Sequence, residues 1–335
     1  MARSLMLAMA LVSLGGWAAA GEGWKAYTNA EGLPGNEIQF LKQDDAGAIW
    51  VGTLQGLGVW RDGKFAVALK DCPAYDVLTQ GQGQRWVGTG NGAVLINGEV
   101  RKGDLKGSLV APLVAYDDKT VWAIAKDRGT EQNKLVAWSG GEWQPVDRFK
   151  AEKVVDLART PSGTVWVTID GDGAYAVDPK QGVASAVKHL KGSNVNPIAE
   201  DSKKRTWAGL LKGGVMAFDG KEWTRHLEKE KSAVFSIKED AAGNIWVATN
   251  ANGIWRYDGK KWTNDLAEEG AITMLATTSD GKVWISSQMT GGLRYWENGK
   301  WTVALAGPLP VRCLLETKDK KVWAGGVLDG VHVQP

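Results

Sequence analysis

The hydrophobic and polar positions of the chain repeat in a fixed pattern. An apolar residue, a tryptophan, a second apolar residue and a small residue occur in succession, and a glycine followed by an apolar residue comes shortly afterwards. The pattern occurs eight times, with its tryptophans at Trp50, Trp86, Trp122, Trp166, Trp207, Trp246, Trp284 and Trp323. The spacings of 36, 36, 44, 41, 39, 38 and 39 residues fit four short strands joined by tight turns. They predict the blades of a β-propeller.

The clearest copy of the pattern surrounds Trp50. Its alternation predicts strands at Ile38 to Lys42, Ala48 to Gly52, Gly56 to Trp60 and Lys64 to Leu69. Asp, Asn and Gly residues lie between these strands, where turns are needed. The copy around Trp246 has nearly the same layout.

The two ends of the chain predict how the ring closes. After Trp323 only one further strand, Gly330 to Val333, fits before Pro335, so the eighth copy lacks its outermost strand. The segment Gly23 to Tyr27 resembles the fourth strands that begin at Trp223, Trp262 and Trp301. Pairing it beside the last copy would close the ring and cover two strand edges. We therefore expect an all-β, eight-bladed propeller whose last blade is completed by residues 23–28; seven blades with one degenerate copy is the alternative.

The first twenty residues have the pattern of a secretory signal. Arg3 precedes the apolar run Leu5 to Leu14, and small residues follow up to Ala20. We expect a signal peptide at residues 1–20, cleavage between Ala20 and Gly21, and a single propeller domain at residues 21–335. A buried N-terminal helix is the alternative. No later apolar run is long enough to span a membrane, so we expect an exported protein, in the periplasm or secreted. We also expect a monomer.

Composition excludes several other classes. Among the 335 residues, 44% are hydrophobic and 23% are charged, which is typical of a globular protein rather than a disordered chain or one with many membrane spans. A net charge of +2 gives no general attraction for nucleic acid or an anionic membrane. With two cysteines and three histidines, we expect no metal and no cofactor. Cys72 and Cys313 are expected to be free thiols, with a disulfide as the alternative.

The repeated tryptophans have a structural interpretation. A large aromatic side chain at the same strand position of every copy fills the wedge between neighbouring blades. A surface that stacks on sugars would need aromatic residues on exposed loops instead. We therefore expect the eight tryptophans to be buried.

Two segments of the first copy resemble a known repeat. Tyr27 to Ile38 reads YTNAEGLPGNEI, and Asp44 to Thr53 reads DDAGAIWVGT and is followed by Gly56-Leu57-Gly58. These segments resemble the two-component regulator propeller repeat, and the resemblance extends over nearly all of residues 21–335, most clearly around Trp50 and Trp246. The repeat forms the periplasmic sensing propellers of many bacterial sensor kinases.

The resemblance implies a function as well as a fold. Sensing propellers of this kind are non-catalytic and recognise ligands outside the inner membrane. They are followed by a β-sandwich, a membrane helix and kinase modules, which the present sequence lacks. The resemblance therefore implies a free-standing recognition module that binds a small ligand or an envelope protein, including a separate sensor, with no nucleic acid and no transmembrane anchor. It does not identify the ligand.

A candidate site follows from aligning the copies on their tryptophans. Twelve and nine residues before each tryptophan the positions are almost all aliphatic, whereas eleven and ten residues before it the residue types vary. The varied pair is expected at the mouth of the central channel, where propellers commonly bind ligands. The polar candidates are Gln39, Tyr75, Asp76, Asp156, Asn196 and Arg312. The alternative is that these side chains only solvate a water-filled channel.

A second candidate site is a local concentration of basic residues. On the loops that lead into the fourth, fifth and sixth copies we expect a basic arc formed by Arg148, Lys153, His189, Lys191, Arg225 and His226. Such an arc suits an anionic saccharide or an acidic protein surface. The alternative is a set of ordinary solvated loops.

Catalytic and metal-binding interpretations are weaker. His226 with Glu228 is the one nearby pair comparable to the acid–base groups of propeller lyases. Asp170-Gly171-Asp172-Gly173 begins like a calcium loop but lacks the later ligands. We therefore expect a non-enzymatic recognition module, with a protein scaffold of the cell envelope as the first alternative and a lyase as the second.

Overall fold

The computed structural model describes residues 23–80, 83–97, 99–102, 105–130, 132–150 and 152–334. The predicted signal peptide at residues 1–20 lies outside the described residues.

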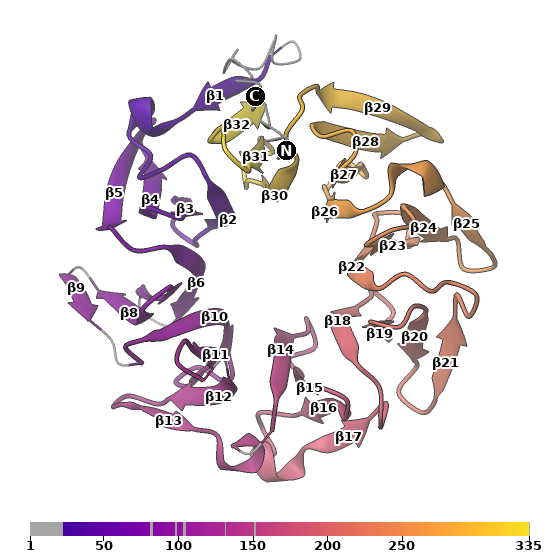
Figure 1. The fold of residues 1–335 in the computed structure, drawn as a ribbon, viewed down its shortest axis with the longest axis horizontal. Helices are drawn as coiled ribbons and strands as arrows, with labels where there is room; N and C mark the ends of the chain where they lie inside the picture. Colours follow the sequence, from indigo (N-terminus) through magenta and orange to yellow (C-terminus); the bar gives the residue numbers. More distant parts are fainter. Residues whose placement is uncertain are drawn as a thin grey trace, which may run out of the picture.

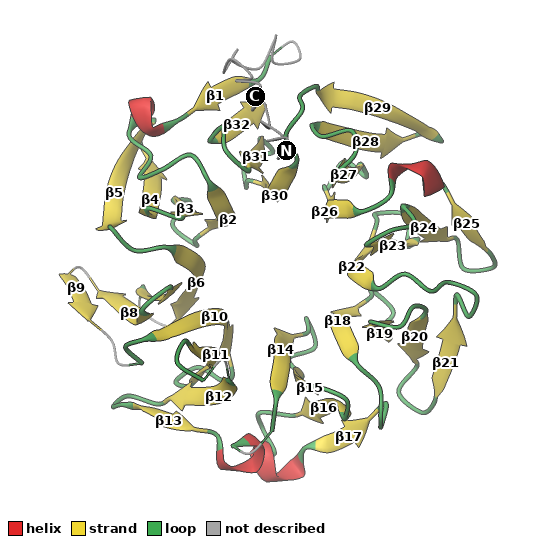
Figure 2. Ribbon diagram, viewed as in Figure 1, coloured by secondary structure: helices red, strands yellow, loops and turns green. Residues whose placement is uncertain are grey.

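The described residues form eight four-stranded antiparallel sheets arranged as blades around one axis (Figure 1). The predicted eight-bladed propeller is confirmed, and the seven-bladed alternative is wrong. Each inner strand contacts the inner strands of the blades before and after it, and β2 contacts β30 to complete the ring. Short 3-10 helices lie in four connections at the periphery (Figure 2): η1 (Asn29–Glu31), η2 (Asp147–Phe149), η3 (Val183–Ser185) and η4 (Ala267–Glu269).

The strands fall into four concentric layers. The innermost strands of blades 1 to 8 are β2 (Ile38–Gln43), β6 (Ala74–Gln80), β10 (Ser108–Ala115), β14 (Val154–Arg159), β18 (Val195–Glu200), β22 (Val234–Glu239), β26 (Ile272–Thr277) and β30 (Val311–Glu316). The second strands are β3 (Ile49–Thr53), β7 (Gln84–Thr89), β11 (Val121–Asp127), β15 (Val165–Ile169), β19 (Thr206–Leu210), β23 (Ile245–Thr249), β27 (Val283–Ser287) and β31 (Val322–Gly326).

The two outer layers have the same order. The third strands are β4 (Gly56–Arg61), β8 (Gly92–Asn97), β12 (Asn133–Trp138), β16 (Gly173–Val177), β20 (Val215–Phe218), β24 (Ile254–Tyr257), β28 (Leu293–Glu297) and β32 (Val331–Gln334). The outermost strands are β5 (Lys64–Lys70), β9 (Glu99–Lys102), β13 (Trp143–Pro145), β17 (Val187–His189), β21 (Trp223–His226), β25 (Trp262–Asn264), β29 (Lys300–Leu305) and, for blade 8, β1 (Lys25–Tyr27).

The N-terminal strand closes the ring as the sequence predicts. β1 pairs antiparallel with β32, Ala26 lying opposite His332. Trp24, 7% exposed, meets Trp284 of blade 7 edge to face, with 6.5 Å between ring centroids. Tyr27 packs on the other side of the blade against Trp60 of blade 1, at 5.0 Å. Closure therefore joins blades 7, 8 and 1 through aromatic contacts as well as through strand pairing.

In several blades an aspartate lies six residues before the repeated tryptophan, and a hydrogen bond between the two explains this spacing. In blade 6, Asp240 accepts hydrogen bonds from the Asn244 N–H at 2.9 Å and from the Trp246 indole N–H at 2.7 Å. Gly243 supplies the left-handed conformation of this turn, with φ of 81°. The pairs Asp44–Trp50 and Asp201–Trp207 repeat the arrangement. One aspartate thus closes the turn and satisfies the buried indole that lies six residues later.

The repeated tryptophans fill the wedges between blades. All eight are between 0% and 4% exposed. Several of them face aromatic rings of the next blade. Trp246, for example, meets Trp296 and Trp301 edge to face, with ring centroids 5.8 and 5.9 Å away. This burial confirms the structural interpretation of the tryptophans and excludes them as a sugar-stacking surface.

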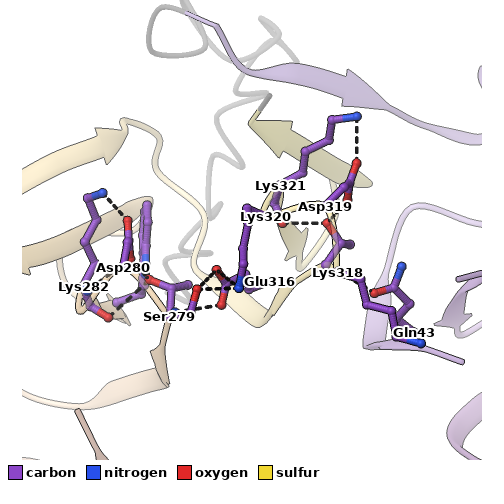
Figure 3. Close-up of polar contacts among 12 residues, drawn as sticks. Gln43, Ser279, Asp280, Lys282, Glu316, Lys318, Asp319, Lys320 and Lys321 are labelled. Atoms are coloured by element: carbon purple, nitrogen blue, oxygen red, sulfur yellow. Dashed lines mark hydrogen bonds and ion pairs between the residues drawn. The ribbon is translucent and has the colours of Figure 1, made fainter. Parts of the chain in front are cut away.

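The turns between inner and second strands lie on one face of the ring, which we call the turn face, and they hydrogen-bond from blade to blade. Figure 3 shows the junctions of blades 7, 8 and 1. The Ser279 N–H and hydroxyl donate to Glu316 at 2.8 and 2.5 Å, and the Lys318 N–H donates to Gln43 at 2.8 Å. Ser162–Glu200 and Ser202–Glu239 form the same contact. Many polar groups of the turn face are thus engaged in holding the blades together.

No helix among the described residues is long and apolar enough to cross a membrane.

Candidate functional site

All eight inner strands begin on the face opposite the turn face. We call this face the start face. The strand pairing on that face is interrupted at the same place in every blade. In every blade the pairing of the inner strand with the second strand slips near its beginning, in a β-bulge. The slip leaves one inner-strand residue without a partner in six blades, and two, the second a proline, in blades 3 and 5. The first residue without a partner in each blade belongs to a set that we call the bulge ring: Gln39, Tyr75, Ala111, Val155, Asn196, Phe235, Thr273 and Arg312. A bulge turns its side chain away from the regular alternation, and bulges are common beside functional sites.

The side chains of the bulge ring are more exposed than those of the residues that precede them. The aliphatic residue preceding each bulge is at most 3% exposed. In contrast, every bulged residue is at least partly exposed, and Phe235 is 50% exposed. The bulges therefore keep one hydrophobic anchor in each blade while presenting a side chain of variable type to solvent.

Four of the sequence-predicted residues belong to this ring, and two of these contact one another. Gln39 and Arg312 lie on neighbouring blades, and the Arg312 guanidinium donates to the Gln39 amide oxygen at 2.7 Å. Tyr75 and Asn196 occupy the bulges of blades 2 and 5. The contact from Arg312 to Gln39 spans the junction at which the ring closes.

Asp76, one residue beyond the bulge of blade 2, is a structural residue. It is 7% exposed. Its carboxylate accepts from the Lys42 ammonium at 2.5 Å and from the backbone N–H of Leu113 at 2.7 Å, groups that belong to blades 1 and 3. These contacts join three blades and engage both carboxylate oxygens, so they favour a structural role for Asp76 over the predicted ligand contact.

Asp156 occupies the corresponding position of blade 4 and has a different environment. Among the described residues it has no cationic partner, whereas Asp76 is paired with Lys42. Burial raises the pKa of the Asp156 carboxyl, and a hydrogen bond from the Leu157 N–H acts in the opposite direction. Asp156 thus lacks the lysine partner that engages Asp76, and its role in ligand binding stays a prediction.

The six residues of the predicted basic arc do not act as a unit. His189, Arg225 and His226 lie on the outermost strands β17 and β21 and not on loops, which corrects the predicted placement. Lys153 lies 3.8 Å from Asp170, and the Arg148 guanidinium lies 4.9 Å from the centre of the Tyr175 ring. Of the six, Lys153 is the one residue that makes an ion pair among the described residues.

The two histidines of that set belong to interblade packing. The Trp223 indole donates to Nδ1 of His189 at 3.1 Å, and the Trp262 indole donates to Nδ1 of His226 at 3.3 Å. Burial lowers the pKa of both histidines, and the charge of Arg205 lowers that of His226 further.

No hydrogen bond or ion pair joins His226 to Glu228 in the part of the chain that the structure describes. A lyase-type acid–base role for this pair therefore has no geometric support.

These histidines predict a pH dependence of stability. Their pKa is lower in the folded protein than the unfolded value of about 6.5, so the unfolded chain binds more protons as the pH falls. The stabilisation is fully present above about pH 6.5 and is lost as the pH falls from there through the folded pKa values. We expect the urea midpoint to fall more between pH 7.5 and 5.0 in the native protein than in the double variant His189→Asn/His226→Asn. Equal pH dependence in both proteins would contradict this assignment.

Both cysteines are free, as expected from the sequence. Cys72 precedes β6 of blade 2, and Cys313 lies in β30 of blade 8. Burial raises the pKa of the Cys313 thiol to about 12. A thiol with such a pKa is a poor nucleophile at neutral pH, which disfavours a reactive role for Cys313.

The segment Asp170 to Gly173 begins like a calcium loop, but each of its two aspartates lies close to a lysine. Asp170 lies 3.8 Å from Lys153, and Asp172 forms an ion pair with Lys188 and accepts from the Tyr175 hydroxyl at 3.1 Å. Among the residues with described positions, no group of three or more His, Cys, Asp and Glu side chains is arranged to hold a metal ion.

Sequence reasoning missed the apolar component of the start face. Phe235 lies eleven residues before Trp246, the same position as the polar candidates, but polarity is the wrong criterion for it. The loops between second and third strands also lie on this face, and three of them carry exposed apolar residues: Leu211 at 42%, Met289 at 72% and Leu328 at 53%. With Phe235, these residues extend over blades 5 to 8. Their importance depends on their exposure to solvent, and the sequence of a single loop does not indicate that exposure.

Comparison with known proteins supports the resemblance and the fold. Residues 32–55 and 230–251 match the family described as two-component regulator propeller. These segments span the loop before the inner strand through the second strand in blades 1 and 6, the copies in which the sequence resemblance is clearest. No match was found among curated protein sequences.

Several solved structures share the fold. The extracellular domain of the hybrid two-component system BT3049 from B. thetaiotaomicron has a TM-score of 0.52 and 18% identity, covering 92% of this chain and 53% of that one. The chain thus spans about half the length of that domain. Virginiamycin B lyase from Staphylococcus aureus has a TM-score of 0.55 and 11% identity, with 92% and 97% covered. YCF48 bound to D1 peptide has a TM-score of 0.55 and 14% identity, with 93% and 96% covered.

Proposed function

We propose that this protein is a non-catalytic recognition module of the periplasm or cell exterior that binds a small ligand at the bulge ring. The observation that carries the proposal is the bulge repeated in all eight blades, which presents a different side chain from each blade on one face. A scaffold of constant residues surrounding variable exposed ones is the arrangement that recognition sites require. The resemblance to sensor propellers and the signal-like N-terminal sequence agree with it.

The ring offers a ligand three kinds of contact. Asn196 provides an amide, Arg312 a guanidinium, and Tyr75 and Phe235 provide aromatic surfaces, all at least partly exposed. Asp156 adds a carboxyl with a raised pKa. Such a mixture supports oriented binding through hydrogen bonds and apolar contact. It lacks the paired acid and base that catalysis of the lyase type would need.

The experiment that tests this proposal is a capture followed by mutagenesis. The tagged chain is incubated with an extract of the cell envelope, and the small molecules that it releases on denaturation are identified by mass spectrometry. The affinity for the released compound is then measured by calorimetry. We expect Tyr75→Ala, Phe235→Ala and Arg312→Ala each to weaken binding at least about tenfold, corresponding to the loss of about 1.4 kcal/mol.

The matched control lies away from the ring. Val303 on β29 is 57% exposed, so Val303→Ala removes a similar exposed apolar group without touching the start face. Its affinity is expected to remain native. Unchanged affinity in all three ring variants would contradict the placement of the site.

A second candidate function, protein docking, is favoured by the exposed apolar residues of blades 5 to 8. Leu211, Phe235, Met289 and Leu328 are all on the start face, and such clusters mark interaction surfaces. The structural neighbour YCF48 has been solved with a bound peptide. This candidate predicts that Met289→Ser/Leu328→Ser abolishes capture of a stoichiometric protein partner, whereas Tyr75→Ala leaves that capture intact.

A further inference from the structure

A small cavity opens on the start face between blades 4 and 5. Its volume is about 250 Å³, and its walls come from glycine-containing loops of both blades together with Ser193, Asn194, Lys212 and Arg225. Ligand pockets for whole drug-sized molecules are about 300–1,000 Å³ in volume. A cavity of this size accommodates one chemical group of a larger ligand rather than the entire molecule.

The polar side chains that line the cavity are rich in hydrogen-bond donors. The Asn194 side-chain oxygen accepts from the Gly171 N–H. Its amide nitrogen makes no hydrogen bond within the described residues, and the same is true of the Ser193 hydroxyl. The side chains of Lys212 and Arg225 make no ion pair or hydrogen bond among the residues that the structure describes. The cavity therefore offers a hydroxyl, an amide N–H₂, an ammonium and a guanidinium.

The neighbouring carboxylates do not neutralise these cations. Asp170 and Asp172 flank Gly171 on the cavity wall, but each is paired with its own lysine. Lys153 lies 3.8 Å from Asp170, and Lys188 forms an ion pair with Asp172. The positive charge of Lys212 and Arg225 thus remains uncompensated by protein groups. A guanidinium and an ammonium together with neutral donors form a typical environment for a bound oxyanion.

The cavity lies close to the bulge residue of blade 5 along the chain. Asn194 lines the cavity, and Asn196 of the bulge ring follows two residues later on the same segment. Two residues of extended chain span about 7 Å. A ligand with one group in the cavity can therefore reach the bulge ring with its remaining part.

We infer that this cavity is an oxyanion subsite, and that the ligand of the bulge ring carries a carboxylate, sulfate or phosphate group that Lys212 and Arg225 bind. The inference rests on the proposed function for the remainder of the ligand, but oxyanion binding by the cavity is testable by itself. The shared chemistry is a group with several negatively charged oxygens. Whether it belongs to a saccharide or to a peptide side chain is decided by the captured ligand.

The test uses sulfate and acetate as probes on the full folded protein. Sodium sulfate or sodium acetate is titrated at constant ionic strength against sodium chloride, and the backbone amides of residues 192–194 and 212–213 are followed by NMR. We expect saturable shifts with millimolar affinity for at least one probe. In the variant Lys212→Gln/Arg225→Gln the affinity should fall at least about tenfold, the loss of about 1.4 kcal/mol.

The control variant is Lys229→Gln/Lys231→Gln, which removes two exposed lysines of the same face that do not line the cavity. It changes the net charge by the same amount, so it should retain native probe affinity. Shifts that do not saturate, or that are lost equally in both double variants, would overturn the subsite.

The experiments distinguish failure of the oxyanion subsite from failure of ligand binding at the bulge ring. Phe235→Ala and Arg312→Ala should leave sulfate binding unchanged, because neither residue lines the cavity. A captured ligand without an anionic group would overturn the subsite while leaving recognition at the bulge ring intact. A captured anionic ligand whose affinity depends on Lys212 and Arg225, but on none of the ring residues, would support the subsite and contradict the ring.

Discussion

A chain that begins at residue 29 is expected to lose the closed ring, whereas a chain that begins at residue 21 keeps it. The shorter chain lacks β1, so the edge of β32 loses its strand partner. It also lacks Trp24 and Tyr27, whose rings contact Trp284 on one side and Trp60 on the other. Removing a single buried tryptophan side chain costs about 3–5 kcal/mol. The combined loss is therefore a large part of the stability of an ordinary domain.

The measurement compares the urea unfolding and the size-exclusion profile of the two chains. We expect a lower unfolding midpoint and self-association of the shorter chain, because an uncovered strand edge pairs with other chains. A synthetic peptide of residues 21–28 should restore the midpoint by adding the missing strand. The matched peptide with Trp24→Ala and Tyr27→Ala should not. A shorter chain that stays monomeric with native stability would contradict closure by β1.

Replacement of a repeated tryptophan should have the next largest effect. Trp246 is 0% exposed, donates its indole N–H to Asp240 at 2.7 Å and contacts two rings of blade 7. Trp246→Ala leaves a cavity between blades 6 and 7 and leaves Asp240 without that donor. We expect the free energy of unfolding to fall by about 3–5 kcal/mol.

Phe235→Ala provides the contrasting aromatic substitution. Phe235 lies in the same blade as Trp246 but is 50% exposed. Its removal should change the free energy of unfolding by no more than about 0.5 kcal/mol. Denaturant unfolding of both variants separates the two roles. Equal destabilisation by the two substitutions would show that the bulge ring contributes to the core and is not free for binding.

Much of the fold was predictable because its determinants are local. The distance from Asp240 to Trp246 is six residues, and one turn brings the carboxylate to the indole. The same spacing in other blades makes the repeat visible in the sequence. The closing strand was predictable for a different reason: the last copy lacks one strand, and Trp24 begins a segment that resembles the missing one.

The candidate site was only partly predictable because its contacts cross blades. Alignment on the tryptophans located the bulged positions, since each bulge lies at a fixed distance from its tryptophan. It did not show that the Asp76 carboxylate accepts hydrogen bonds from the Lys42 ammonium and the Leu113 N–H, which lie 34 and 37 residues away in the chain. Nor did it show that indole N–H groups 34 and 36 residues later in the chain bind His189 and His226.

The sequence by itself determined the number of blades, the position of each inner strand and the closure of the ring, because turn chemistry and hydrophobic spacing act over a few residues. The tertiary structure decided which polar and charged side chains remain available to a ligand. Asp156 and Asp76 occupy equivalent positions, yet Asp76 alone has a lysine partner. Arg225 and His226 are adjacent, yet one lines a cavity and the other packs among aromatic rings. These differences depend on the neighbouring blade, whose residues are distant in sequence and come close only when the ring is formed.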